Sequence, residues 1–154
     1  MLSSSSTVEE SQPLLRKTFE VEDSLPALLR KSLAELVGTF IFVFFIGMSK
    51  RAHLLQPFVP AFSLVFLKFS LAHISLAALN PALSLALVLR GVLSWKNLIF
   101  YIVAELLGGA LGACMAAAFT DKISDVVILQ IQSGIGFGFL AEFLGTFGEI
   151  DRLF

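Results

Sequence analysis

The stretch from His73 to Gly91, HISLAALNPALSLALVLRG, decides the fold. Its apolar run extends from Pro81 to Leu89 and is bounded by Asn80 and by Arg90-Gly91. A helix needs about 20 apolar residues to cross a bilayer, so this run is too short to span one. Asn80 is a strong helix N-cap, proline fits the first helical position, and glycine suits the end of a helix. The stretch therefore predicts a half-helix over residues 80–90.

Three longer apolar segments flank this short run, over residues 32–49, 57–77 and 98–119. At about 1.5 Å per residue, each can cross a thin or locally adapted bilayer. A further apolar run stops at Phe147, where the charged ending GEIDRLF begins, so we expect an incomplete fourth span. The predicted fold is an all-α membrane protein: three transmembrane helices, one re-entrant half-helix and the start of a fourth span.

The composition is typical of a chain dissolved in lipid. Of the 154 residues, 56% are hydrophobic and sixteen are Phe, and the mean hydropathy is +0.87. Charged residues make up 15%, against roughly 25% in soluble proteins, which excludes a soluble enzyme. The net charge of −1 excludes a basic surface for nucleic acid. Because Cys114 is the one cysteine and no nucleophile–base pair or metal cluster is visible, we expect no cofactor, no metal and no enzymatic activity.

Basic residues predict the orientation of the spans. Six precede the first and third spans, and three lie on the opposite side: Arg16, Lys17, Arg30, Lys31, Arg90 and Lys96 against Lys50, Arg51 and Lys122. We therefore expect a cytosolic N-terminus and a half-helix that enters the membrane from the cytosol. Residues 1–31 are rich in Ser and Glu and lack apolar periodicity, which predicts a disordered cytosolic tail.

A short sequence occurs twice in the chain. AELVGT at 34–39 recurs as AEFLGT at 141–146. Three hydrophobic elements separate the copies, and an odd number reverses the direction of entry, so the second copy starts an inverted repeat. The expected organisation is a first half-repeat over 32–120, a loop over 121–133, the start of a second half-repeat over 134–147 and a divergent charged tail over 148–154.

A half-helix that begins inside the membrane leaves backbone N–H groups and a partial positive charge near the middle of the bilayer. Such an arrangement is tolerated only where it lines a wet cavity or is buried in protein. The Asn80 amide can donate a hydrogen bond to water in a narrow passage, and the helix dipole disfavours cations and protons there. On spacing alone, a proline-kinked or interfacial helix is an equal alternative.

The stretch 73–91 resembles the first NPA loop of the aquaporin (major intrinsic protein) family, which typically reads HISGAHxNPAVTLALALRG. The AE-x-x-GT start of the first span, YIVAELLGGALGA at 101–113 and the second AEFLGT agree with the family in order and spacing. The resemblance covers about residues 32–147. It implies a bundle of six spans and two half-helices, assembled as a homo- or hetero-tetramer with one pore per subunit for water or small neutral solutes.

The resemblance also implies roles for individual residues. The pore donor is Asn80, and the contact between the two loops is made by Pro81 and Ala82. The backbone carbonyls of three preceding residues form a ladder of acceptors: Leu76, Ala77 and Ala78.

Three further residues match the family's loop supports, namely Glu35, Glu142 and His73. An intramembrane carboxylate needs a partner or a proton, so a structural role for Glu35 is favoured, with proton transport as the alternative. A structural role for His73 is favoured over a pH gate. Small residues recur every fourth position on the third span and predict close helix packing: Ala104, Gly108 and Gly112.

The departures from the family are informative. Leu76 stands where the motif has Gly, and Ala78 stands where it has a second His. An ungapped count places Pro60 where the family has a filter aromatic, and a small shift would bring Phe58 or Phe62 to that position, so the aromatic is not assigned. Lys68 within the second span has no expected counterpart, so it must face protein or water.

A second NPA motif and the filter arginine that follows it are not in this sequence. We therefore expect a truncated or incomplete channel in a plasma or vacuolar/endosomal membrane, whose selectivity the sequence does not define. The alternatives are a non-conducting isoform that associates with full-length aquaporins and modulates their assembly or trafficking, and, more remotely, a dimer of half-channels.

Overall fold

The computed structural model describes residues 24–49, 56–120 and 148. In these ranges the chain forms four helices, with no strand among the residues described: α2 (Leu25–Ser49), α3 (Phe58–Ser75), α4 (Pro81–Leu89) and α5 (Trp95–Thr120). By length and composition, α2, α3 and α5 can each cross a membrane, whereas α4 is too short. The prediction of an all-α membrane protein with three spans and a half-helix is confirmed.

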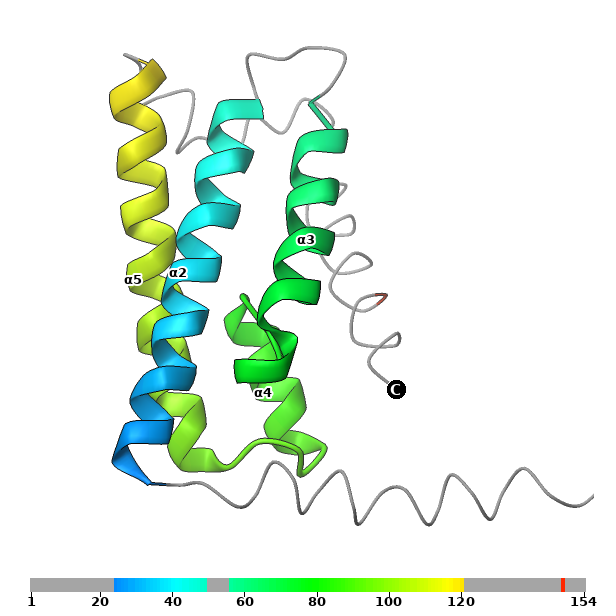
Figure 1. The fold of residues 1–154 in the computed structure, drawn as a ribbon, viewed down its shortest axis with the longest axis vertical. Helices are drawn as coiled ribbons and strands as arrows, with labels where there is room; N and C mark the ends of the chain where they lie inside the picture. Colours follow the sequence, from blue (N-terminus) through cyan, green and yellow to red (C-terminus); the bar gives the residue numbers. More distant parts are fainter. Residues whose placement is uncertain (1–23, 50–55, 121–147, 149–154) are drawn as a thin grey trace, which may run out of the picture.

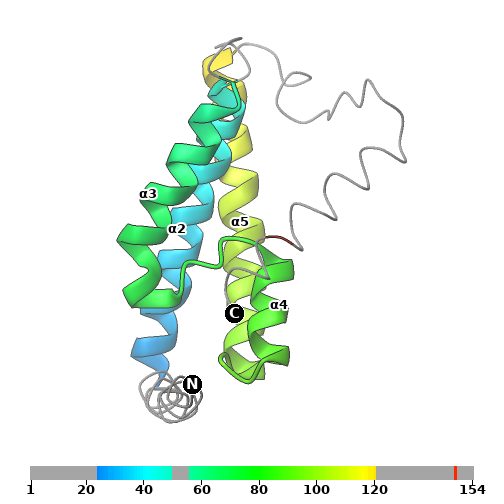
Figure 2. The same ribbon diagram turned by 90° about the vertical axis from the view of Figure 1, so that its right-hand side faces the viewer.

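The three long helices stand side by side, and α2 packs against both α3 and α5 (Figure 1). The chain descends through α3, turns back into the bundle, and starts α4 part-way along the length of α5 (Figure 2). From there α4 returns to the end of the bundle at which α2 and α5 begin. This path is that of a re-entrant segment, which enters and leaves on the same side.

Small residues of α5 allow its close approach to α2. A Cβ atom added to Gly112 would lie 2.5 Å from the carbonyl oxygen of Phe40, and one added to Gly108 would overlap the carbonyl oxygen of Leu36. Ala104, one turn earlier, is buried on the same face. The structure therefore places the predicted stripe of small residues at the α2–α5 contact.

The first helix starts earlier than the predicted span. Residues 25–31, which the sequence analysis assigned to the tail, form the first turns of α2. Ala27, Leu28 and Lys31 are buried there, at the spacing of one helical face, so the helix continues the buried face of the span. The predictions for 121–147 and 149–154, Glu142 among them, concern residues outside those that the structure describes.

Candidate functional site

The start of α4 is capped as the sequence predicts. Asn80 has an extended backbone (φ −157°, ψ 123°), and its side-chain Oδ1 accepts a 2.9 Å hydrogen bond from the N–H of Ala82. Pro81 occupies the first helical position. At the other end Gly91 adopts φ 72° and donates to the carbonyl of Val88. Both predicted ends of the half-helix are confirmed.

The segment between α3 and α4 has an uncommon backbone. Leu76, Ala77 and Leu79 have φ angles of 74°, 48° and 53°, in the left-handed region that favours glycine. Each such residue costs about 1–2 kcal/mol relative to the right-handed conformation. This conformation persists only where the surroundings determine it, so the groups that hold the segment are part of the site.

Glu35 of α2 is the main support of this segment. Its side chain is fully buried; Oε1 accepts a 3.1 Å hydrogen bond from the N–H of Ala78, and Oε2 accepts a 2.7 Å bond from the N–H of Leu79. The hydroxyl of Ser75 also donates to this carboxylate, and the charge of Lys68 on α3 acts on it. Glu35 thus ties the end of the strained segment to the first span.

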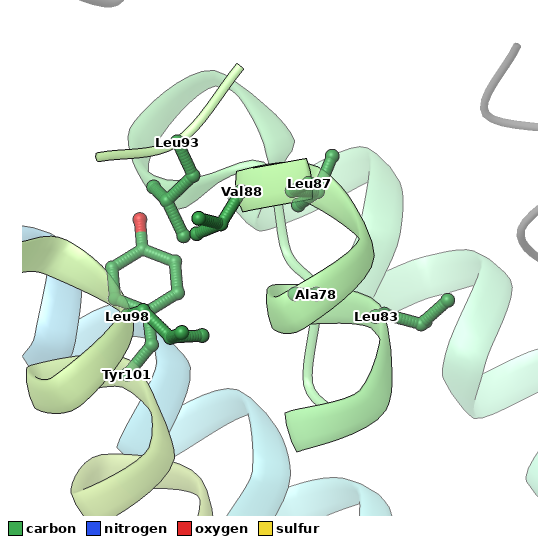
Figure 3. Close-up of a cluster of buried hydrophobic side chains, with 7 residues drawn as sticks. All are labelled: Ala78, Leu83, Leu87, Val88, Leu93, Leu98 and Tyr101. Carbon is green, nitrogen blue, oxygen red and sulfur yellow. The ribbon is translucent and has the colours of Figure 1, made fainter. Parts of the chain in front are cut away.

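Tyr101 of α5 supports the same segment from the other side. Its hydroxyl donates a 2.8 Å hydrogen bond to the carbonyl of Ser75, where α3 ends. The Ser75 hydroxyl in turn accepts a 3.3 Å bond from the N–H of Ala77. The ring packs in a hydrophobic cluster between α4 and α5 (Figure 3), which contains Ala78, Leu83, Leu87, Val88, Leu93, Leu98 and Tyr101.

A second buried carboxylate lies on α5, beside α4. Glu105 is 2% exposed, and its Oε1 accepts a 2.7 Å hydrogen bond from the hydroxyl of Ser84, in the first turns of α4. No role was predicted from the sequence for Glu105, Ser84 or Tyr101. A usable signal was present, because Glu105 follows Tyr101 by four residues and precedes Gly108 by three, which places all three on one helix face.

The predicted site residues lie as follows. Ala77 and Ala78 are buried in the segment before α4, and Leu76, Asn80 and Pro81 are half-buried. Ala82 is exposed at the start of α4, and His73 is exposed in the last turn of α3. Pro60, where the family's filter aromatic was sought, lies within the first turn of α3. Among the described residues, no group of three or more His, Cys, Asp or Glu side chains is arranged to hold a metal ion.

The described helices define the class of protein, a multi-pass membrane protein with a capped, re-entrant half-helix. Comparison with known proteins gives the family. Residues 22–151 match the family described as Major intrinsic protein. The chain is 30% identical over 127 residues to "Probable aquaporin NIP7-1" of Arabidopsis thaliana, covering 77% of this chain and 46% of that protein. It is 36% identical over 119 residues to "Lens fiber major intrinsic protein" of Lithobates pipiens, covering 71% of this chain and 45% of that protein.

A third relative, "Probable aquaporin TIP-type alpha" of Phaseolus vulgaris, is 29% identical over 143 residues, covering 82% of this chain and 56% of the relative. The chain therefore spans about half the length of the curated relatives it matches. The chain belongs to the major intrinsic protein family.

Proposed function

We propose that this chain forms one half of an aquaporin-like channel for water or small neutral solutes. The observation that carries the proposal is the start of α4: a capped helix N-terminus that begins inside the bundle and is preceded by three left-handed residues. Such a terminus presents backbone N–H groups and a partial positive charge within the membrane. A narrow, water-lined passage is the setting in which this arrangement is both tolerated and useful.

The residues of the site divide into donors, acceptors and supports in this proposal. The side-chain oxygen of Asn80 accepts the capping hydrogen bond, so its NH₂ group is available to donate to a passing water or hydroxyl. The carbonyls of Leu76, Ala77 and Ala78 provide acceptors along the approach. Glu35 fixes the backbone conformation of these residues through its hydrogen bonds, and the repeat at 141–146 suggests the same structural role for Glu142 in the other half.

The assembly and the setting of the channel are also proposals. The family relationship favours a second half-helix that meets the Asn80 tip from the opposite side, and a tetramer with one pore per subunit. The excess of basic residues before the first and third spans favours a cytosolic N-terminus, in a plasma or vacuolar/endosomal membrane. The alternative is association with full-length relatives without conduction, in which this chain modulates their assembly or trafficking.

Osmotic shrinkage of proteoliposomes tests the proposal. Vesicles carrying the chain together with the separately expressed second half of an aquaporin are compared with empty vesicles, with vesicles carrying the chain alone, and with Asn80→Asp, which replaces the donor by an anion. Leu111→Val, at an exposed apolar position of α5, is the matched control. We expect water permeability above that of empty vesicles when the wild type or Leu111→Val is combined with the second half, and its loss in Asn80→Asp; the chain alone should match empty vesicles.

A second set of vesicles contains the chain together with a full-length relative. Permeability equal to that of empty vesicles even with the second half present, combined with co-purification and an altered permeability of the full-length relative, would contradict conduction and support the non-conducting alternative. Permeability that survives Asn80→Asp would contradict the role given to Asn80.

A further inference from the structure

Two buried carboxylates lie beside the half-helix, and they bind different parts of the chain: Glu35 binds the segment before α4, and Glu105 binds α4 itself. Glu35 binds the N–H groups of residues 78 and 79, in the segment before α4. Glu105 binds Ser84, which lies within α4 and is itself fully buried, and the backbone N–H of Asn80 also acts on this carboxylate. The two carboxylates come from different spans, α2 and α5. The contact of Glu105 therefore differs from that of Glu35 both in the helix that provides the carboxylate and in the residues that are bound.

The packing of α4 makes the Glu105 contact important. Among the other described helices, α4 packs chiefly on α5. That contact consists of the hydrophobic cluster around Leu83, Leu87 and Tyr101, together with the hydrogen bond from Ser84 to Glu105. Apolar contacts are non-directional and allow a short helix to slide or rotate. The hydrogen bond is directional and joins a buried donor to a buried acceptor, so it sets the register of α4 on α5.

We propose that Glu105 is a positioning residue: through its hydrogen bond with Ser84, it fixes α4, and with it the Asn80 tip, against α5. This inference deepens the proposed channel function, since the tip is the part that would face the solute. The proposal concerns geometry, and its test does not depend on conduction.

The geometry uses an acceptor at this position, and a negative charge is not needed. Oε1 is engaged by Ser84, and the backbone N–H of Asn80 also acts on this carboxylate. The charge of Glu35 also acts on Glu105, and it has the same sign. An amide oxygen can accept from Ser84 as the carboxylate does. Glu105→Gln is therefore the conservative variant that should keep the position of α4, while Glu105→Leu and Ser84→Ala should lose it.

The experiment measures two distances by electron paramagnetic resonance in the full chain reconstituted in liposomes. One spin label sits on the native Cys114 of α5, and the other on Leu85→Cys, an exposed position of α4. A second pair joins Cys114 to Val37→Cys, an exposed position of α2. Labelled protein is diluted with unlabelled protein, so that both distances are measured within one molecule.

We expect a single narrow α4–α5 distance in the wild type and in Glu105→Gln. In Glu105→Leu and in Ser84→Ala, we expect a shift or broadening of that distance while the α2–α5 distance stays unchanged. Ser84→Ala removes one hydroxyl and keeps the bundle testable if Glu105→Leu fails to fold.

An unchanged α4–α5 distance in Ser84→Ala would overturn the proposal. Loss of position in Glu105→Gln would overturn it as well, because it would show that the charge of Glu105 is what matters. A channel that fails to conduct while these distances behave as expected would refute the proposed function and leave the role of Glu105 intact.

Discussion

Replacement of a glycine of α5 by alanine tests whether α5 is held against α2 by direct backbone contact. A Cβ on Gly112 would lie 2.5 Å from the carbonyl oxygen of Phe40 and 3.1 Å from the amide nitrogen of Phe44. Ordinary van der Waals contact begins at 3.4 Å, so the two helices must separate by about 0.9 Å to admit the methyl group. The obstructing atoms belong to the backbone of α2, which cannot rotate away as a side chain can.

The expected magnitude is the difference between two opposing effects. Overpacking of a close contact costs about 1–3 kcal/mol. Alanine in place of glycine within a helix stabilises the helix by up to about 1 kcal/mol. Because the obstructing atoms are backbone, the cost lies in the upper part of that range, about 2–3 kcal/mol, and we expect Gly108→Ala and Gly112→Ala each to lower the free energy of unfolding by about 1–2 kcal/mol.

Gly109 provides the matched control, since it lies next to Gly108 on the same helix. A Cβ on Gly109 would have its nearest neighbours 4.0 Å away, at the methyl groups of Thr39 and Val43. Gly109→Ala should therefore leave stability unchanged or raise it by up to about 1 kcal/mol. The assay is reversible unfolding in mixed detergent micelles, followed by the fluorescence of Trp95 and by circular dichroism. Equal losses in Gly109→Ala and Gly108→Ala, or no loss in Gly108→Ala, would refute the reasoning.

Three further substitutions address the supports of the half-helix, each measured in the same unfolding assay. Glu35→Gln keeps one acceptor but turns an NH₂ group toward a backbone N–H, so stability should fall by about 2–4 kcal/mol; a loss under about 1 kcal/mol would show that Glu35 is not the main support. Asn80→Ala removes the cap, which should cost about 1 kcal/mol and speed hydrogen exchange at the Ala82 amide; unchanged exchange would contradict the cap. Tyr101→Phe removes the donor to the Ser75 carbonyl while keeping the ring in its cluster, with an expected loss of about 1 kcal/mol; an unaltered stability would mean that water replaces the hydroxyl.

The half-helix could be predicted from the sequence because its signals are local. Asn80, Pro81 and Gly91 act through the backbone conformation and hydrogen bonds of their immediate neighbours, so their types predict both ends of α4. The three spans were predictable for a similar reason, since length and hydropathy are properties of one segment. The start of α2 was less predictable, because the burial of Ala27, Leu28 and Lys31 arises in the folded chain and is not visible in the local sequence.

The supports of the site depend on contacts between spans, and the sequence alone predicted only part of them. Glu35 was identified through a resemblance, and its partners at residues 78 and 79 lie 43 and 44 positions away. The role of Glu105 was missed because a single carboxylate in an apolar span does not reveal which element it faces. Leu76 is a further example, because its left-handed backbone conformation is uncommon for any residue other than glycine and is set by the groups around it.

The distance in sequence between Glu35 and the strained segment has a consequence for biosynthesis. The span that carries Glu35 is translated before residues 76–79, so its carboxylate is available when their N–H groups arrive. The partner of α4, by contrast, is α5, which is translated afterwards. The segment before α4 can therefore dock first, and the half-helix itself settles only once the third span has been inserted.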